Sequence, residues 1–161
     1  MITRLLQRFH NGISDISESK LFDEDTFYPR LLRDINKAGA EIIIESPFVT
    51  SKRLKCLLPA LKRAKSKRVR VAINTRDPQE HNDVMRLDAL KALSQLQHLG
   101  IQVIFTEGHH RKVAIIDRKI LYEGSLNILS QNSSREFMRR TESQAMAWQV
   151  VRFAKLEELI S

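Results

Sequence analysis

The sequence predicts an α/β fold in which helices cover both faces of a mixed β-sheet. Short apolar runs typical of buried strands alternate with longer segments of helical spacing, in the order β-α-β-α-β. Two more apolar runs follow close together, as expected for paired strands. This order is typical of helices packed on a mixed sheet. The 161 residues are enough for one domain with a buried core.

The first half of the chain supplies two helices and two strands. Apolar residues at helical spacing define the helices, and short apolar or alternating runs define the strands. Gly39 ends the first helix, whereas Pro59 must kink the second helix or mark a new start because proline lacks the amide N–H. The four elements cover about residues 27–38, 41–45, 54–61 and 69–73.

The second half begins with a polar loop and a third leucine-rich helix, which Gly100 ends. Three strands follow, and Asp117-Arg118 forms the turn between the last two. We expect a short strand after Glu142 and then a C-terminal helix. The helix, the three strands and the C-terminal helix cover about residues 87–99, 101–105, 113–116, 119–122 and 150–159. Residues 1–20 stay unassigned.

The charge balance favours polyanionic partners. Lys and Arg number 27 against 19 Asp and Glu, which gives a net charge of +8. Nucleic acid is the first candidate partner and an anionic membrane surface the second. The single Cys56 excludes an intramolecular disulfide and a cysteine-based zinc site. With no apolar stretch of transmembrane length and no signal-peptide pattern, we expect a cytoplasmic protein and no membrane partner.

One segment combines polar groups at a spacing that suits phosphate chemistry. His110 and Lys112 are two residues apart and would point to one face of a strand. The strand that follows is apolar on both sides, so these two polar groups are costly to place unless they face a polar cleft. Gly124 and Ser125 allow a tight backbone approach, and Asn127 returns an amide to the same cleft. An imidazole, an ammonium and an amide thus converge on a small anion.

The full pattern reads H-x-K, four residues, D, six residues, G-S-x-N. It resembles the signature of the phospholipase D superfamily, and the similarity extends over about residues 26–160. The short chain is similar to the single-motif, nuclease-like branch of that superfamily. The resemblance implies one half-molecule fold over residues 21–161, acting as a catalytic domain. It also implies that His110 attacks phosphorus and forms a phosphohistidine, which water resolves.

The resemblance assigns a role to each remaining motif residue. Lys112 and Asn127 would bind the non-bridging oxygens and stabilise the added negative charge. Ser125 would support the site by hydrogen bonding. Asp117 is interpreted as structural, because a second anion would repel the phosphate. Glu142 would orient His110, although Thr141 stands where the family usually has an asparagine. The chemistry requires no metal and no cofactor.

A single motif per chain predicts a homodimer. The family mechanism uses two histidines, one to attack and one to protonate the leaving oxygen, and this chain has one H-x-K. We therefore expect a two-fold symmetric dimer with the active site across the interface. The two His110 side chains would titrate as a coupled pair and give a bell-shaped pH dependence.

The motif defines the reaction and not the substrate. Residues 46–76 contain ten Lys or Arg and no acidic residue, which suits a phosphate backbone or is simply the solvated face of a helix. Arg135, Arg139 and Arg140 follow the motif closely and are candidates to flank the cleft. With few aromatic residues for base stacking, we expect sequence-tolerant recognition of nucleic acid, DNA ahead of RNA.

Two alternatives stay open. One is a catalytically silent or partner-activated nucleic-acid-binding module within a larger repair or restriction complex. The other is a phospholipid phosphodiesterase, which would need an anchor or an exposed apolar rim that the sequence does not show.

Overall fold

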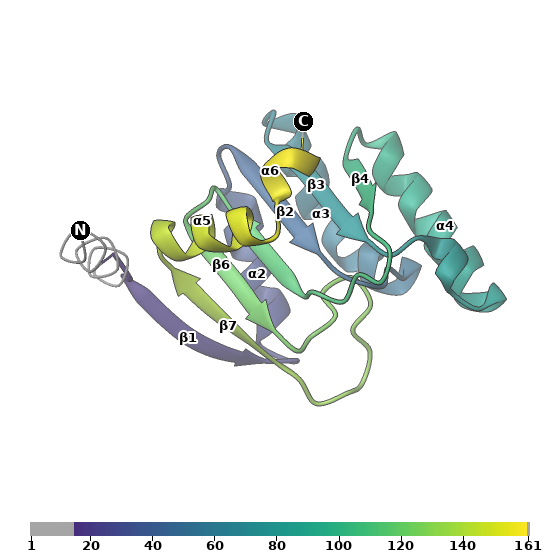
Figure 1. The fold of residues 1–161 in the computed structure, drawn as a ribbon, viewed down its shortest axis with the longest axis horizontal. Helices are drawn as coiled ribbons and strands as arrows, with labels where there is room; N and C mark the ends of the chain where they lie inside the picture. Colours follow the sequence, from purple (N-terminus) through teal and green to yellow (C-terminus); the bar gives the residue numbers. More distant parts are fainter. Residues whose placement is uncertain (1–14, 161) are drawn as a thin grey trace, which may run out of the picture.

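The computed structural model describes residues 15–160, which form an α/β fold with helices on both faces of a seven-stranded sheet (Figure 1). The strand order is β1-β7-β6-β5-β2-β3-β4. The strands are β1 (Glu18–Asp23), β2 (Glu41–Glu45), β3 (Arg70–Thr75), β4 (Gln102–Phe105), β5 (Val113–Ile116), β6 (Ile120–Gly124) and β7 (Phe137–Glu142). The helices are α2 (Phe27–Lys37), α3 (Ser51–Ser66), α4 (Asp83–His98), α5 (Gln144–Phe153) and α6 (Leu156–Leu159), with the short 3₁₀ turn η1 (Pro78–Glu80).

The sheet is parallel in one half and antiparallel in the other. Strands β2, β3 and β4 are parallel neighbours connected through α3 and α4, whereas β5, β6, β7 and β1 pair antiparallel. Because β5 runs against β2, its first residue Val113 lies opposite Glu45, the last residue of β2. The segment before β5 therefore emerges at the same edge of the sheet as the ends of β2 and β6.

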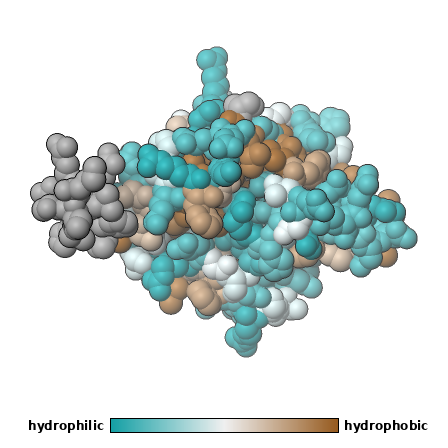
Figure 2. Space-filling view, in the orientation of Figure 1, coloured by the Kyte–Doolittle hydropathy of each residue, from teal (hydrophilic) through white to brown (hydrophobic). Residues whose placement is uncertain are grey.

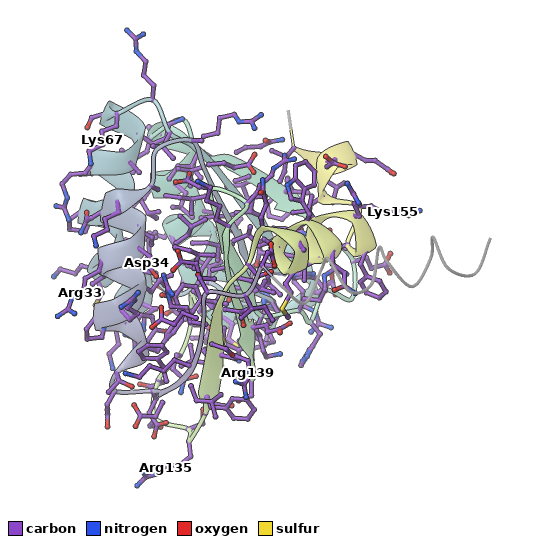
Figure 3. All side chains as sticks on the ribbon, turned by 90° about the vertical axis from the view of Figure 1, so that its left-hand side faces the viewer. Arg33, Asp34, Lys67, Arg135, Arg139 and Lys155 are labelled. Atoms are coloured by element: carbon purple, nitrogen blue, oxygen red, sulfur yellow. The ribbon has the colours of Figure 1, made fainter. Side chains whose placement is uncertain are left out.

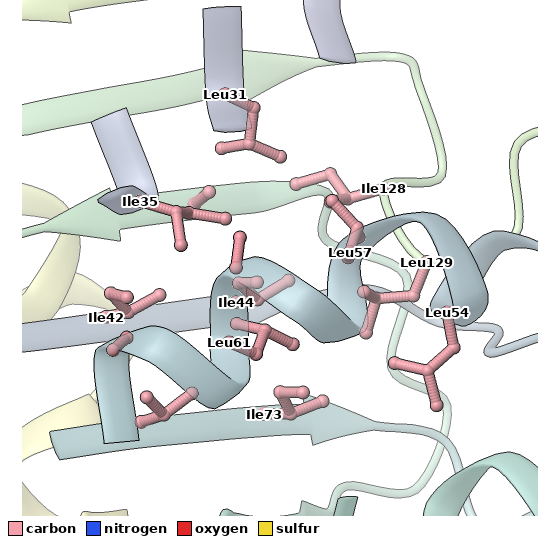
Figure 4. Close-up of a cluster of buried hydrophobic side chains, with 14 of the residues drawn as sticks. Leu31, Ile35, Ile42, Ile44, Leu54, Leu57, Leu61, Ile73, Ile128 and Leu129 are labelled. Carbon is pink, nitrogen blue, oxygen red and sulfur yellow. The ribbon is translucent and has the colours of Figure 1, made fainter. Parts of the chain in front are cut away.

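The main core lies between the sheet and helices α2 and α3 (Figure 4). Ile42 and Ile44 of β2 point into it, whereas Ile43 points to a second, smaller core under α5 and α6. All three are at most 1% exposed, so β2 is buried on both faces. The residues of α2 and α3 that fill the main core include Leu31, Ile35, Leu54, Leu57 and Leu61.

Three elements depart from the sequence-based expectation. The expected C-terminal helix at about residues 150–159 is instead two helices, α5 and α6, separated by the left-handed Lys155. The expected strand after Glu142 is wrong, because β7 ends at Glu142 and α5 begins two residues later with Ser143 as its N-cap. Arg140 is buried within β7, and its charge masks the alternating pattern of that strand. Strand β1 was not expected at all, because its mostly exposed side chains show no apolar pattern. Of the unassigned residues 1–20, residues 1–14 lie outside the described part of the chain.

The exposed face in Figure 2, which carries α5 and α6, is mostly hydrophilic, and its hydrophobic areas are small and interrupted by polar residues. Within residues 15–160, every helix is too short or too polar to cross a bilayer.

The turn between β5 and β6 is tied to the start of β2 by Asp117. Its carboxylate accepts hydrogen bonds from the backbone N–H groups of Gly39, Ala40 and Glu41 at 2.8–2.9 Å. Burial opposes ionisation of this carboxyl, but the three amide donors outweigh it and hold the pKa of Asp117 below its usual range. The backbone of Asp117 is left-handed, with φ 52°, a conformation that Asp tolerates better than most residues.

Replacing Asp117 with Ala should lower the free energy of unfolding by about 3 kcal/mol at pH 7, because three amides lose a charged acceptor and Ala disfavours the left-handed backbone. A depressed pKa stabilises the fold above the unfolded pKa of Asp, and this stabilisation is lost as the pH falls through the folded value. The difference between the two proteins should therefore shrink from pH 7 to pH 3 in denaturant titrations. Asp117→Asn, which keeps one acceptor oxygen, should lose less. Equal stability of the Ala variant would contradict this account.

Candidate active site

His110 and Lys112 lie just before β5, at the edge of the sheet where β2 and β6 end. His110 is exposed, and the Lys112 ammonium Nζ lies 2.9 Å from His110 Nδ1. The same ammonium donates to the His110 carbonyl oxygen at 2.8 Å. An ammonium can only donate, so Nδ1 is the acceptor and the neutral ring carries its proton on Nε2. His110 and Lys112 are therefore held together by hydrogen bonds.

Ser125 and Asn127 follow β6 at this same edge. Gly124 admits the close approach of the next strand, because a Cβ there would lie 2.2 Å from the Phe137 carbonyl oxygen. Ser125 donates its N–H to that oxygen, and its hydroxyl accepts from Phe137 N–H at 3.2 Å. The Asn127 side-chain oxygen is buried and has no hydrogen-bond partner in the described residues. The structure therefore brings His110, Lys112, Ser125 and Asn127 to one edge of the sheet.

The segment that carries the motif is anchored by Arg111. Its guanidinium donates two hydrogen bonds of 2.8 Å to the carboxylate of Glu45, which is fully buried. The Asn74 amide donates to the same carboxylate, and Thr106 donates to Asn74. This bidentate ion pair raises the pKa of Arg111 and fixes the segment between the two motif residues.

Glu136 is a site residue that the sequence reasoning missed. Burial lowers the pKa of Lys112, and the charge of Glu136 opposes that effect, so the carboxylate lies within electrostatic reach of the ammonium. Glu136 immediately precedes β7, and Ser125 holds the start of that strand at the active-site edge. A correct assignment of β7 would have revealed it, because an acidic residue before this strand must lie beside the motif.

Asp117 and Glu142 lie at the opposite edge of the sheet. Asp117 follows the far end of β5, and Glu142 pairs with Ile120 at the far end of β6. Four residues of strand separate this edge from the motif, a distance of about 13 Å. The Glu142 carboxylate accepts from Arg140 instead. The structure does not bring Glu142 to the position from which it was expected to orient His110.

The three arginines after the motif lie in three different environments, and Figure 3 labels Arg135 and Arg139. Arg135 is almost fully exposed in the loop before β7, with one ion pair to Glu24 at 3.7 Å. Arg139 lies on an exposed part of β7 and donates to Ser19. Arg140 is 2% exposed and is paired with Asp34 at 2.7 Å. Burial of Arg140 removes it from any substrate, so only Arg135 lies in the loop connected to the site.

His109 lies in the loop before β5, and its side chain is buried. His109 is only 3% exposed, and neither nitrogen of its ring has a hydrogen-bond partner in the described residues. Burial lowers the pKa of His109, and the nearby charge of Glu45 opposes that shift. The ring is thus a buried polar group close to the Glu45–Arg111 ion pair, and it immediately precedes the exposed motif histidine in the chain.

The geometry supports anion chemistry at this edge. A cationic ammonium and an exposed imidazole lie together at this edge, and Asn127 adds an amide whose NH₂ group is the part that can donate to an anion. Within residues 15–160, no group of three or more His, Cys, Asp or Glu side chains is placed to hold a metal ion. The imidazole is the group at this edge that can act as a nucleophile or as a proton carrier.

Comparison with known proteins finds a matching family model and solved structures of similar fold. A family model described as "Cardiolipin synthase, PLD-like domain" matches residues 31–156. No match was found among curated protein sequences.

Solved structures show the same fold. The phospholipase D family member Nuc from Salmonella typhimurium is 18% identical, with a TM-score of 0.67 over 84% of this chain and 91% of that one. NucT from Helicobacter pylori is 20% identical, with a TM-score of 0.66 over 86% and 93%. Polyphosphate kinase from Porphyromonas gingivalis is 14% identical, with a TM-score of 0.70 over 89% of this chain but 26% of that one.

Replacing His109 with Leu should stabilise the fold by about 1–3 kcal/mol, because it removes a buried polar ring without partners. A lowered folded pKa means that the unfolded chain binds more protons, so the native protein loses stability as the pH falls below about 6.5, the unfolded value. The advantage of the variant should therefore widen from pH 8 to pH 5 in denaturant titrations. Substitution of the exposed His98 by Leu is the control and should not stabilise the fold, because His98 Nδ1 already has a hydrogen-bond partner in the Ser94 carbonyl oxygen. An advantage that is constant with pH would show that His109 does not titrate as inferred.

Proposed function

The chain belongs to the family of phospholipase D-like domains, and from this premise we propose that it is a metal-independent nuclease whose active site is completed by a second copy of the chain. Family membership confirms the resemblance inferred from the motif and supports phosphodiester chemistry. The observation that carries the proposal is the contact between exposed His110 and Lys112 beside Asn127. One such set supplies one imidazole, and the proposed reaction needs two.

The proposed reaction has two steps. When the substrate binds, the Lys112 ammonium leaves His110 Nδ1 and donates to a non-bridging phosphate oxygen. The proton of the His110 ring moves from Nε2 to Nδ1 by exchange with solvent. His110 Nε2 then forms a bond to phosphorus while the bond to the leaving oxygen breaks. His110 of the partner subunit gives a proton to that oxygen. In the second step, the partner subunit's His110 takes a proton from water. The water oxygen attacks phosphorus, and the bond between phosphorus and the nucleophilic His110 breaks.

Two further groups assist in this scheme. The Asn127 amide and Lys112 stabilise the charge that develops on the non-bridging oxygens. Glu136 balances the charge of Lys112. The scheme needs one neutral and one protonated His110, so loss of the second imidazole proton sets the alkaline limit of activity and the pH dependence is bell-shaped. Lys112, whose pKa burial lowers, stays the cation that binds the non-bridging oxygens.

Nucleic acid is the proposed substrate, with DNA ahead of RNA, and the proposed compartment is the cytoplasm. The net charge of +8 and the exposed Arg135 near the site support a polyanion. A nuclease in contact with its own genome needs restraint, so we propose weak intrinsic activity, preference for an unusual DNA structure, or recruitment by a partner in a larger complex.

Cleavage of labelled single- and double-stranded DNA and RNA in excess EDTA tests the reaction. We expect cleavage that His110→Ala abolishes, with loss of at least about 10³-fold because the nucleophile is removed. Binding without any cleavage would replace the proposal with a silent or partner-activated module. No binding of nucleic acid, with hydrolysis of an anionic phospholipid instead, would replace it with the phospholipid alternative.

Mixing experiments test the shared site. When subunits exchange at random, one equivalent of His110→Ala should reduce the activity of a fixed amount of unaltered protein to about half, and nine equivalents to about one tenth, because mixed dimers lack one imidazole. Adding a folded, unrelated basic protein controls for competition for substrate. If His110→Ala leaves the activity unchanged after subunit exchange, each chain carries a complete site.

A further inference from the structure

The positive charge of the chain is concentrated in one segment. Ten basic and three acidic residues lie between Arg33 and Arg68, so this segment carries seven of the eight net positive charges. The three acidic residues, Asp34, Glu41 and Glu45, are all at most 4% exposed. The surface of the segment therefore presents cations without neighbouring exposed carboxylates of its own.

Each buried carboxylate is already neutralised by an arginine from elsewhere in the sheet. Arg140 pairs with Asp34, Arg118 with Glu41, and Arg111 with Glu45. None of the surface cations between Arg33 and Arg68 forms an ion pair with a residue that the structure describes. We call them the α2–α3 face: Arg33, Lys37, Lys52, Lys55, Lys62, Arg63, Lys65, Lys67 and Arg68.

The side chains of this face point away from the sheet. In Figure 3, Arg33 and Lys67 project outward on the side of α2 and α3, Asp34 turns toward the sheet, and Lys155 lies on the opposite side. Arg63 and Lys67 of the α3 region both bond to Asn36 of α2, which joins the two helices into one surface. The face is thus continuous across both helices.

The α2–α3 face begins beside the candidate active site. Helix α3 starts at the end of the loop that follows β2, and Lys52 in its first turn donates to Asn132 at 3.2 Å. The next residue, Arg53, donates to the Gln131 carbonyl oxygen at 2.8 Å. Both acceptors belong to the loop that follows Asn127. From there α3 runs for 16 residues, about 24 Å, away from the site.

We propose that the α2–α3 face holds the phosphate backbone of a nucleic-acid strand as it leaves the active site. This inference rests on the proposed nuclease function. The length of α3 corresponds to about seven nucleotides at 3.4 Å each. The face makes no sequence-specific contact, because lysine and arginine on a helix surface meet phosphates and not base edges.

A membrane surface fits this face less well. Binding to a bilayer combines basic residues with apolar side chains that enter the acyl region. The exposed large hydrophobic residues of the described chain lie on other elements, and none belongs to α2 or α3. The chemistry of the face is therefore purely cationic, which favours a hydrated polyanion.

The test compares two charge reversals of equal size. Lys55→Glu with Lys62→Glu alters the α2–α3 face, and Arg152→Glu with Lys155→Glu alters the exposed end of α5 and its following turn. Affinity for a fluorescent 20-nucleotide DNA strand is measured by anisotropy over a salt series, and thermal unfolding verifies that both proteins fold. The neutral pair Lys55→Gln with Lys62→Gln is a second variant in case the reversal unfolds the protein.

We expect the α2–α3 reversal to weaken binding of the 20-nucleotide strand by about tenfold or more at low salt and to reduce the salt slope by about 1.5–2. Binding of a 4-nucleotide strand should change much less, and the Arg152/Lys155 pair should behave like the unaltered protein. Equal losses in both pairs, or equal losses for both strand lengths, would overturn the inference. So would preferential binding of phosphatidylglycerol vesicles that depends on Lys55 and Lys62.

Cleavage by the unaltered protein separates this result from the proposed function. If the unaltered protein cleaves no strand but the α2–α3 reversal alone weakens long-strand binding, the nuclease proposal fails and the binding face stands. If the unaltered protein cleaves DNA and the reversal has no effect on binding or on the dependence of cleavage on strand length, the binding face fails.

Discussion

The ion pair between Glu45 and Arg111 is the constraint on which the candidate site depends. Glu45 ends the central strand β2 without any exposure to solvent, and its charge requires a cationic partner. Arg111 provides this partner from between His110 and Lys112, so the motif residues on either side of it are held at the sheet edge. A planar guanidinium with two hydrogen bonds fixes direction as well as position. The fold thus orients the reactive side chains through a residue that does not itself need to touch the substrate.

The other two buried acidic residues are also paired with arginines. Asp34 pairs with Arg140, and Glu41 pairs with Arg118, in each case across different elements. Tyr122 adds a hydrogen bond to Asp34, and burial together with that contact raises the pKa of the tyrosine far above its usual range. Interior acidic residues are therefore balanced by arginines, and the cations of the α2–α3 face remain on the surface without carboxylate partners.

The sequence was sufficient for the α/β fold, the parallel half of the sheet and the motif, because these depend on apolar periodicity and fixed spacing. It was insufficient for β7, since buried Arg140 hides the alternation that marks a strand. The sequence favours Glu142 because Thr141 and Glu142 stand where the family usually has an asparagine–glutamate pair, but Glu142 lies far along β7, whereas Glu136 precedes that strand. The burial of His109 was likewise out of reach, because it depends on how the loop folds against Glu45.

Strand β1 forms one outer edge of the sheet and supports β7. It pairs with β7 along all six of its residues and brings Glu18 to the buried Arg140. A proteolytic cut between β1 and α2 that released this strand would leave the backbone N–H and C=O groups of β7 open as a new sheet edge and would remove one counter-charge of Arg140. Strand β1 is itself the outermost strand of the sheet, so its loss would move the open edge, a template for pairing with other chains, from β1 to β7.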